Sequence, residues 1–410
     1  MSRDRATDFP THLSVDAARQ RIVELCTRRP LTTENVPIER ALDRILAADV
    51  VAPHAIPPFA NSAMDGFALR GADLLPDGSK RFRLRGTMLA GTRAPLQVAA
   101  DECVRITTGA PLPQGADTIA IRETLRMDGA QVVIEGAPAR GAHVRYAGED
   151  VRAGDRVLRT GEALTPSRVA LAGALGHAQV KVAQRPTVAV FTTGDELVEP
   201  GIPLQPGQIH DSNRELLMGL LRAEGMEPTA WPTLPDDPSR LASALCDAAS
   251  SFDVVITCGA VSAGEKDHIP GLLQARGRVH FWKVRMKPGM PLLFGALERA
   301  QVLGLPGNPV SVLATWLTLG RALLDGLQGR REPRLRWHAR LAADFDKRNA
   351  RREFLRGRLL AGVDGVLQVA PNPADGSHRL AAAADSDVLI VLPENERLFR
   401  AGDVVEVLPY

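Results

Sequence analysis

The stretch TVAVFTTGDE at residues 187–196 joins an uninterrupted apolar strand to a turn that holds a glycine and two carboxylates. A strand without apolar–polar alternation is typical of a sheet that helices cover on both faces. The following residues predict helices at 213–224, 238–249 and 310–327, with Asp237 as the N-cap of the second and Pro238 at its first position, and strands at 253–258, 292–294 and 302–305. This rhythm predicts a doubly wound, mostly parallel α/β domain over residues 184–328.

The residues before this domain have a different texture. Helical spacing runs over 14–52, with Ser14 as the expected N-cap, until the prolines of 53–58 interrupt it. Short strands between glycine and proline turns are expected from there to 144, and short strands with one helix follow as far as 182. A charged linker at 329–333 leads into a last segment of β texture.

The expected fold is therefore multidomain, α/β plus β. A doubly wound α/β domain is combined with two intertwined N-terminal domains and a C-terminal β domain. The expected boundaries are 10–52 with 144–183 for a discontinuous mixed helical/β domain, 53–143 for an inserted β domain, 184–328 for the α/β domain and 329–410 for the C-terminal β domain.

Composition excludes several classes of function. The 410 residues carry a net charge of only +2, from 50 Lys and Arg against 48 Asp and Glu, so bulk charge favours neither nucleic acid nor an anionic membrane as a partner. The first 16 residues resemble no signal peptide, and the apolar runs are of strand length. The four cysteines are scattered without CxxC spacing, which argues against a zinc site and fits a reducing compartment. We expect a soluble, cytoplasmic protein.

Three loops are expected at the carboxyl ends of strands, where open α/β sheets bind ligands. They read TGDE at 193–196, GAVSAGEKD at 259–267 and LPGNPVS at 305–311. Glycine turns that precede helices suit an oxyanion, because backbone N–H groups can approach it closely. The second loop resembles a Walker motif, but Glu265 and Asp267 stand in the wrong places, which excludes a nucleoside triphosphatase. Ordinary βα turns are the alternative for any single loop.

Charged side chains gather near these loops. Asp195, Glu196, Asp236 and Asp267 are hard oxygen ligands, and in a phosphate-handling site they suggest Mg²⁺. Lys283 and Lys287 could neutralise an anionic substrate. Solvated surface charge is the alternative for each of them. Two further polar turns, at 61–68 and 107–113, carry Asp65 and Thr108, which tight turns alone explain less well.

Taken together, the motifs resemble the molybdopterin molybdenumtransferase (MoeA) family. The matching segments, in the family's order over about residues 12–410, are NSAMDGFA at 61–68, TTGAPLP at 107–113, GED at 148–150, FTTGDEL at 191–197, QIHDSNR at 208–214, DDP at 236–238, GAVSAGEKD at 259–267, LPGNPVS at 305–311 and GSH at 376–378.

The resemblance implies an elongated homodimer of four-domain subunits. Its active cleft would lie between the α/β domain of one subunit and N-terminal β elements of the other. The implied substrates are molybdopterin with an AMP group on its phosphate, and molybdate. The implied reaction is Mg²⁺-dependent: the adenylate is hydrolysed and molybdenum is placed on the dithiolene.

The resemblance also implies roles for individual residues. The residues matched to activity are Asp65, Thr108, Asp150, Glu196, Asp236 and Asp267, with Asp195, Glu196 and Asp267 as the expected metal ligands. The residues matched to substrate binding are Gly259, Ser262, Gly264, Lys283, Lys287, Pro306 and Asn308, with Ser311, Arg351, Arg356 and Ser377 for molybdate. Arginine and hydroxyl donors suit a tetrahedral oxyanion. Electrostatic positioning would then carry the catalysis, because no Ser-His-Asp or Cys-His constellation is found.

Two positions depart from the family pattern, and two other functions stay open. Met290 stands where many relatives have a lysine, which removes a cation from the expected molybdate pocket, and Ala260 replaces a glycine. One alternative is molybdopterin adenylyltransferase, an enzyme that resembles the α/β domain alone and is also a possible partner. The other is a non-catalytic molybdopterin carrier or scaffold, which would bind without turnover.

Overall fold

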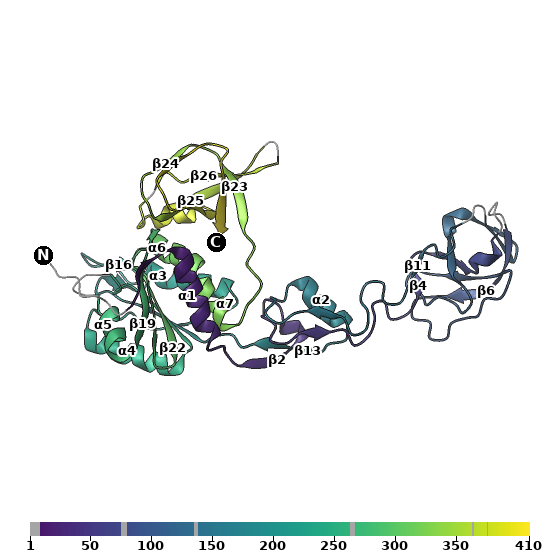
Figure 1. The fold of residues 1–410 in the computed structure, drawn as a ribbon, viewed down its shortest axis with the longest axis horizontal. Helices are drawn as coiled ribbons and strands as arrows, with labels where there is room; N and C mark the ends of the chain where they lie inside the picture. Colours follow the sequence, from purple (N-terminus) through teal and green to yellow (C-terminus); the bar gives the residue numbers. More distant parts are fainter. Residues whose placement is uncertain (1–8, 75–79, 135–137, 263–266, 363–364, 375) are drawn as a thin grey trace.

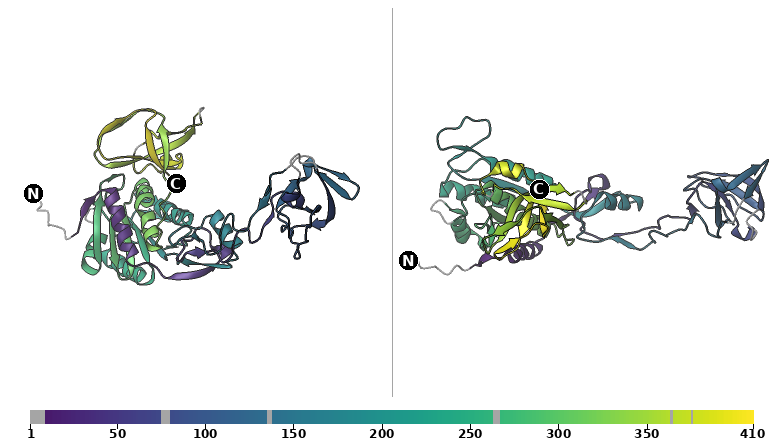
Figure 2. Two further views of the ribbon diagram at one scale, coloured as in Figure 1. Left: turned by 45° about the vertical axis from the view of Figure 1, so that its right-hand side comes forward. Right: turned by 90° about the horizontal axis from the view of Figure 1, so that it is seen from above.

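The computed structural model describes residues 9–74, 80–134, 138–262, 267–362, 365–374 and 376–410. The α/β domain and the C-terminal domain form a body at one end of the molecule (Figure 1). A slender arm runs from this body and carries a small β domain at its far end, as the view from above also shows (Figure 2). The chain passes out along the arm and back, so the far domain is an insertion.

The α/β domain is built on a seven-stranded sheet in the order β1-β19-β21-β22-β18-β14-β17. Its strands are Thr11–Leu13 (β1), Arg278–Val284 (β19), Leu293–Leu297 (β21), Ala300–Leu305 (β22), Val254–Cys258 (β18), Val188–Thr192 (β14) and Thr229–Ala230 (β17). The strands β22, β18, β14 and β17 are parallel, whereas β21 is antiparallel to both of its neighbours. The predicted mostly parallel sheet is confirmed.

Helices cover both faces of this sheet, as the apolar strands predicted. On one face lie α4 (Pro238–Ser251) and α5 (Ile269–Arg276). On the other lie α1 (Val15–Thr27), α3 (Ser212–Ala223) and a long helix that runs from α6 (Pro309–Thr315) through the π-helical turn η4 (Trp316–Gly320) to α7 (Arg321–Leu327). Along β14, Val188 and Val190 pack on the second face and Ala189 and Phe191 on the first, because successive side chains alternate.

Residues 11–27 belong to the α/β domain, and not to the first N-terminal domain where we expected them. The strand β1 pairs in parallel with β19, and the buried stripe of α1 joins the same core as α7. This stripe consists of Val15, Ala18, Ile22 and Cys26. The spacing of apolar residues locates the buried face of a helix, but it carries no information on which element covers that face.

The helical pattern that we expected over residues 14–52 ends at Thr27. The chain then forms β2 (Thr33–Pro37), the short 3₁₀ helix η1 (Ile38–Arg40) and β3 (Val50–Val51). Proline is not tolerated inside a helix, and Pro30 and Pro37 lie within this segment. The strands β2 and β3 pair with the later strands β13 (Gln179–Ala183) and β12 (Arg156–Leu158). With α2 (Pro166–Ala174) they form the base of the arm, around a core of their own.

The inserted domain is a six-stranded sheet in the order β8-β5-β7-β6-β10-β9 with a small core on each face. Its strands are Gly66–Leu69 (β5), Lys80–Met88 (β6), Glu102–Ile106 (β7), Thr118–Ile121 (β8), Leu125–Asp128 (β9) and Gln131–Ile134 (β10), with short 3₁₀ helices at Gly71–Asp73 (η2) and Arg122–Thr124 (η3). A two-stranded ribbon of β4 (Asn61–Ser62) and β11 (Val144–Arg145) lies where the chain enters and leaves this domain.

The C-terminal domain is a small barrel, because β25 pairs with both β26 and β27 and thereby closes the ring β25-β26-β23-β29-β27. Its elements are Trp337–Leu341 (β23), Phe345–Lys347 (β24), Arg352–Ala361 (β25), Leu367–Pro371 (β26), Leu380–Ala384 (α8), Val388–Leu392 (β27), Arg397–Phe399 (β28) and Val404–Pro409 (β29). One strand of the α/β domain, β20 (Met286–Lys287), pairs in parallel with β25 and joins the two domains.

One helical stretch, Pro309–Leu327, is long and apolar enough to cross a membrane by length and composition alone. We had expected no apolar stretch of this length. However, 83% of its most apolar window is buried inside the protein, and its side chains belong to the core on one face of the sheet. The stretch is therefore the core helix of the α/β domain.

Candidate functional site

A cavity of about 490 Å³ lies at the carboxyl ends of β14, β18 and β22. These three strands are parallel neighbours in the sheet, so the loops that follow them converge on this cavity. Each predicted loop contributes to its wall, through Thr193 and Gly194, through Gly259 and Ala260, and through Gly307 and Asn308. Convergence of such loops at one sheet edge is the usual position of a ligand site in this class of fold.

The first two loops pack so closely that only glycine fits at position 259. Gly259 has a φ of +98°, and a Cβ atom there would lie 2.6 Å from the hydroxyl oxygen of Thr193. The N–H of Thr193 in turn donates to the carbonyl of Cys258, at 3.1 Å. The indole of Trp282 donates to the carbonyl of Val261 at 2.8 Å and holds the second loop from its far side.

Three of the predicted carboxylates, Glu196, Asp236 and Asp267, line the cavity. Asp195 does not line it, and its carboxylate accepts the backbone N–H of Asp236 at 3.1 Å. Within the described part of the chain, no group of three Asp, Glu, His or Cys side chains could hold a metal ion by itself. Protein carboxylates that hold Mg²⁺ are commonly one or two in number, and substrate phosphate and water supply the other ligands. The carboxylates present fit that arrangement.

The segment 208–214 resembles the family pattern, but sequence reasoning assigned no site role to Asp211, Ser212 and Asn213 at the start of α3, which line the same cavity. The carboxylate of Asp211 is buried, accepts the Thr192 hydroxyl at 2.5 Å and caps the helix by accepting the N–H of Arg214 at 3.1 Å. The side-chain amide of Asn213 donates to the carbonyl of Gly307 at 2.6 Å and ties α3 to the third loop. An aspartate before a helical pattern is a recognisable cap signal, but its burial depends on tertiary packing.

The C-terminal domain closes one side of the cavity. Asn308 donates to the hydroxyl of Ser377 at 3.0 Å, and the neighbouring His378 lines the cavity together with Leu380. Arg356, which we expected to bind molybdate, is buried and donates to the carbonyl of Gly376 at 2.9 Å. It therefore supports this loop from behind.

Several other predicted substrate-binding residues do not line the cavity. Pro306 and Ser311 are buried within the third loop, Ser262 is exposed in the second, and Gly264 lies outside the described residues. The ammonium of Lys283 lies 4.8 Å from the centroid of the Trp282 ring. These residues belong to the loops or support them, and the described wall of the cavity does not include them.

A second charged group lies where β20 meets β25. Lys287 forms an ion pair of 2.7 Å with Glu353, whose side chain is buried. Met290, the residue that departs from the family pattern, has its sulfur 3.8 Å from a guanidinium nitrogen of Arg351. A cation is therefore present beside position 290 even though that position carries none.

Asp65 and Thr108 lie together at the far end of the molecule, in the inserted domain. The carboxylate of Asp65 accepts both the N–H and the hydroxyl of Thr108, at 2.8 and 2.9 Å. The backbone hydrogen bond and then the hydroxyl hold the pKa of the Asp65 carboxyl below its usual range, so it is ionised. Asp150 lies in the connection between the arm and the inserted domain, and its N–H donates to Ile56. None of the three lines the cavity of the same chain.

Three family models match the chain in succession. The MoeA N-terminal region (domain I and II) matches residues 13–176, a probable molybdopterin binding domain matches 189–326, and the MoeA C-terminal region (domain IV) matches 338–410. The cavity is thus built mainly from the second of these matched regions, and His378 and Leu380 come from the third.

Similar proteins match over almost their whole lengths. A molybdopterin molybdenumtransferase of Haemophilus influenzae is 38% identical over 402 residues, which cover 97% of this chain and 98% of that protein. Molybdopterin molybdenumtransferase 2 of Mycobacterium tuberculosis is 37% identical over 400 residues, covering 95% and 97%. The crystal structure of a molybdopterin biosynthesis MoeA protein from Pyrococcus horikoshii superposes with a TM-score of 0.81 at 28% identity, covering 98% of this chain and all of that one. The chain therefore belongs to the MoeA family of molybdopterin molybdenumtransferases.

Proposed function

We propose that this protein is an enzyme of molybdenum cofactor biosynthesis, which inserts molybdenum from molybdate into adenylated molybdopterin and releases AMP. The observation that carries the proposal is the cavity at the carboxyl ends of β14, β18 and β22. Three carboxylates meet there with glycine-rich loops whose N–H groups can approach an oxyanion. The region is similar to molybdopterin-binding domains. The relatives named above bear the corresponding name.

The chemistry that this site supports is electrostatic. Water attacks the phosphoanhydride of the adenylate, and AMP leaves. Molybdate then forms two Mo–S bonds to the dithiolene, and one of its oxygens leaves as water with the two thiol protons. One or two of Glu196, Asp236 and Asp267 would hold Mg²⁺ together with the substrate phosphates, and the ion would supply positive charge to the leaving phosphate. Cys258 also lines the cavity, but burial raises the pKa of its thiol, so it stays protonated and is no nucleophile.

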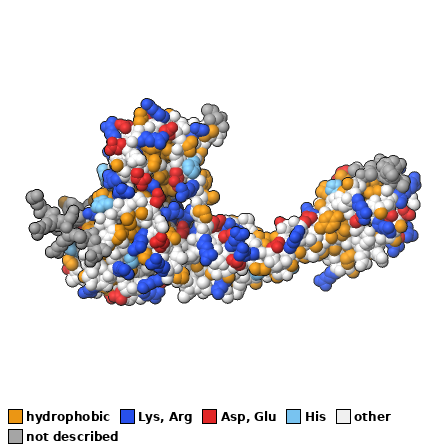
Figure 3. All heavy atoms as spheres, viewed as in Figure 1, with side chains coloured by type: hydrophobic (Ala, Val, Ile, Leu, Met, Phe, Trp, Pro, Cys, Tyr) orange, Lys and Arg blue, Asp and Glu red, His pale blue; other side chains and the backbone are white. Residues whose placement is uncertain are grey.

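We propose that the working unit is a homodimer in the cytoplasm. Asp65 and Thr108 cannot serve the cavity of their own chain, because the whole arm separates the two (Figure 1). A second copy can bring them to it. Figure 3 shows hydrophobic side chains on the surface of the inserted domain. Exposed large apolar residues of this domain and its connections are Phe59, Met64, Leu89, Leu96, Met127 and Tyr146. Such residues suit burial against a partner.

Molybdate would bind beside the cavity, where Arg351, Ser377 and Lys287 supply guanidinium, hydroxyl and ammonium donors. Arg356 would act on the molybdate site indirectly, because it donates to the carbonyl of Gly376 and thereby supports the loop that carries Ser377. A direct hand-over of adenylated molybdopterin from the adenylyltransferase of the pathway would suit a labile substrate. The net charge of +2 gives this function no electrostatic reason to involve nucleic acid or an anionic membrane.

The test is AMP release from adenylated molybdopterin, with Mg²⁺, with and without molybdate. We expect molybdate-dependent release, together with activation of a molybdoenzyme that lacks its cofactor. Glu196→Ala should abolish release but leave the fold and molybdopterin binding intact. The matched control is Glu199→Ala, because Glu199 is an exposed carboxylate that pairs with Arg214 outside the cavity wall. Normal turnover by Glu196→Ala would refute the assigned role, and tight binding without release by the wild type would favour a carrier or scaffold.

A further inference from the structure

The linker between the α/β domain and the C-terminal barrel is bonded to the arm. The backbone N–H groups of Arg331 and Glu332 both donate to the carbonyl of Gly161, at 2.9 and 3.4 Å. The carboxylate of Glu332 accepts two guanidinium nitrogens of Arg168, on α2, at 2.7 and 2.8 Å. It also accepts the backbone N–H of Ala163 at 3.2 Å. A bidentate arginine–carboxylate pair has a defined geometry, so it constrains orientation as well as distance.

The same linker is fixed to the body only two residues later. The guanidinium of Arg334 binds both carboxylate oxygens of Asp325, on α7, at 2.9 Å each. It also forms an ion pair of 2.7 Å with Glu224, at the end of α3, and Glu224 in turn accepts Arg321. Residues 332–334 therefore connect the helices of the body to α2 of the arm through two bidentate pairs.

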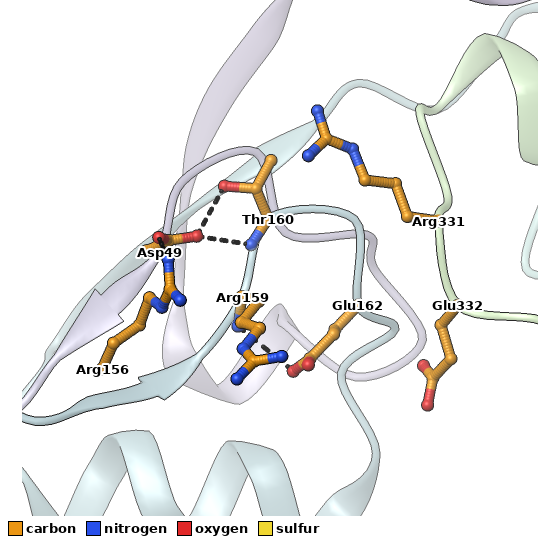
Figure 4. A pocket seen from close by; sticks show the side chains of 7 residues that line it. All are labelled: Asp49, Arg156, Arg159, Thr160, Glu162, Arg331 and Glu332. Carbon is orange, nitrogen blue, oxygen red and sulfur yellow. Dashed lines mark hydrogen bonds and ion pairs between the residues drawn. The ribbon is translucent and has the colours of Figure 1, made fainter.

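The contact region between the arm and the linker, which these ion pairs bridge, is polar. A cavity of about 550 Å³ opens between the arm and the linker, and every residue that lines it is charged or polar (Figure 4). In this view the side chain of Arg331 extends above the turn at Thr160, and Glu332 lies on the opposite side of the space from Asp49. Apolar packing is thus absent from the described wall of this cavity. A Cβ atom on Gly161 would lie 2.6 Å from the Arg331 side chain, so the turn is seated directly against the linker.

We propose that Glu332 and Arg168 are positioning residues, whose ion pair sets the angle between the arm and the body. Through that angle they set where Asp65 and Thr108 of one subunit meet the cavity of its partner. The second statement rests on the proposed function and its shared cleft. The first rests on the contacts of the linker alone. In the proposed function molybdopterin binds to the α/β domain of the body, so the pair should affect turnover without affecting binding.

The test combines a distance measurement with kinetics on the full-length protein. Nitroxide labels on Ser251→Cys, in α4, and Ala130→Cys, in the exposed turn between β9 and β10, report the distance between the body and the inserted domain in a Cys246→Ala background. Labelled chains are mixed with excess unlabelled chains, so that a dimer carries one labelled subunit. The variants are Glu332→Gln, Arg168→Lys and the exchanged pair Glu332→Arg with Arg168→Glu. The control is Asp344→Asn, which breaks a solvent-exposed ion pair between Asp344 and Arg400, both of the C-terminal domain.

We expect Glu332→Gln and Arg168→Lys to broaden the distance distribution and to lower kcat about tenfold, since displaced catalytic groups lose rate steeply. The dissociation constant for molybdopterin should not change, and the exchanged pair should restore part of both effects. The control should behave as the wild type. An unchanged distance distribution in Glu332→Gln would overturn the proposal, and so would a broadened one with an unchanged kcat. A wild type without AMP release would refute the proposed function, while the distances would still decide the role of the ion pair.

Discussion

Replacing Asp211 should destabilise the α/β domain by an amount that depends on what replaces it. This carboxylate lies at the junction of β14 and α3, is 1% exposed and accepts three hydrogen-bonding or ionic contacts. The Thr192 hydroxyl donates at 2.5 Å, the N–H of Arg214 at 3.1 Å, and the guanidinium of Arg214 lies at 3.4 Å. The substitution Asp211→Ala removes all three contacts at once.

The magnitude follows from these contacts. A helix N-cap contributes about 1 kcal/mol, and a hydrogen bond to a buried charged group about 1.5–3 kcal/mol. Asp211→Ala also takes the close acceptor from the buried Thr192 hydroxyl, and it leaves the Arg214 guanidinium with the exposed Glu199 as its ionic partner and the Thr233 hydroxyl as an acceptor. We therefore expect a loss of about 3–5 kcal/mol in the free energy of unfolding. Asp211→Asn keeps an efficient cap acceptor and loses only the charge, so about 1–2 kcal/mol is expected.

Urea unfolding followed by tryptophan fluorescence measures both variants, because Trp231, Trp282 and Trp316 all lie in the α/β domain. Hydrogen exchange along α3 supplies a second, local measurement. The expected order of stability is wild type, then Asp211→Asn, then Asp211→Ala. A loss below about 1 kcal/mol in Asp211→Ala would refute the reasoning that the buried carboxylate stabilises this junction. Equal losses in the two variants would refute the view that the cap hydrogen bond and the negative charge of Asp211 each contribute to stability.

Gly259→Ala should destabilise the domain by about 1–3 kcal/mol and lower AMP release, because a Cβ atom at this positive φ displaces the neighbouring loop. Urea unfolding and an AMP-release assay measure the two effects, and a variant with wild-type stability and activity would contradict the prediction. Burial raises the pKa of Glu224, but the cations of Arg334 and Arg321 outweigh burial and hold the pKa below its usual value. The stabilisation by this carboxylate is thus fully present above about pH 4.5 and is lost as the pH falls through the lower pKa that Glu224 has in the folded protein. In Glu224→Gln, the free energy of unfolding should therefore fall less steeply at acid pH, as urea unfolding at a series of pH values can show. Iodoacetamide should modify only Cys246 in the native protein, as mass spectrometry of peptides can show, because the other three thiols are buried.

Local signals in the sequence predicted the elements well wherever the cause is local. Ser14 caps α1 and Asp237 caps α4, with Pro238 at the first helical position, because these effects involve only the next few residues. The apolar strands around 188–192 and 254–258 predicted a sheet covered on both faces. The partner of α1 was not predictable in this way, since its stripe would fit any apolar surface.

The candidate site shows the same division. Glu196, Asp236 and Asp267 converge because the strands that precede their loops share one sheet edge, and the order of the elements already indicated that edge. The pairing of Lys287 with Glu353 requires the barrel to dock on β20, which no local pattern expresses. The support of a loop carbonyl by the buried Arg356 likewise depends on how β25 closes the ring.

The length of the arm has a genetic consequence. In the proposed dimer, each cleft takes its carboxylates from one chain and its Asp65–Thr108 pair from the other. Two inactive alleles, one altered at Glu196 and one at Asp65, would then complement each other within mixed dimers, since one of the two clefts in such a dimer receives only intact parts. Random reassortment makes half of all dimers mixed, so a cell that expresses both alleles equally would recover about a quarter of the normal activity.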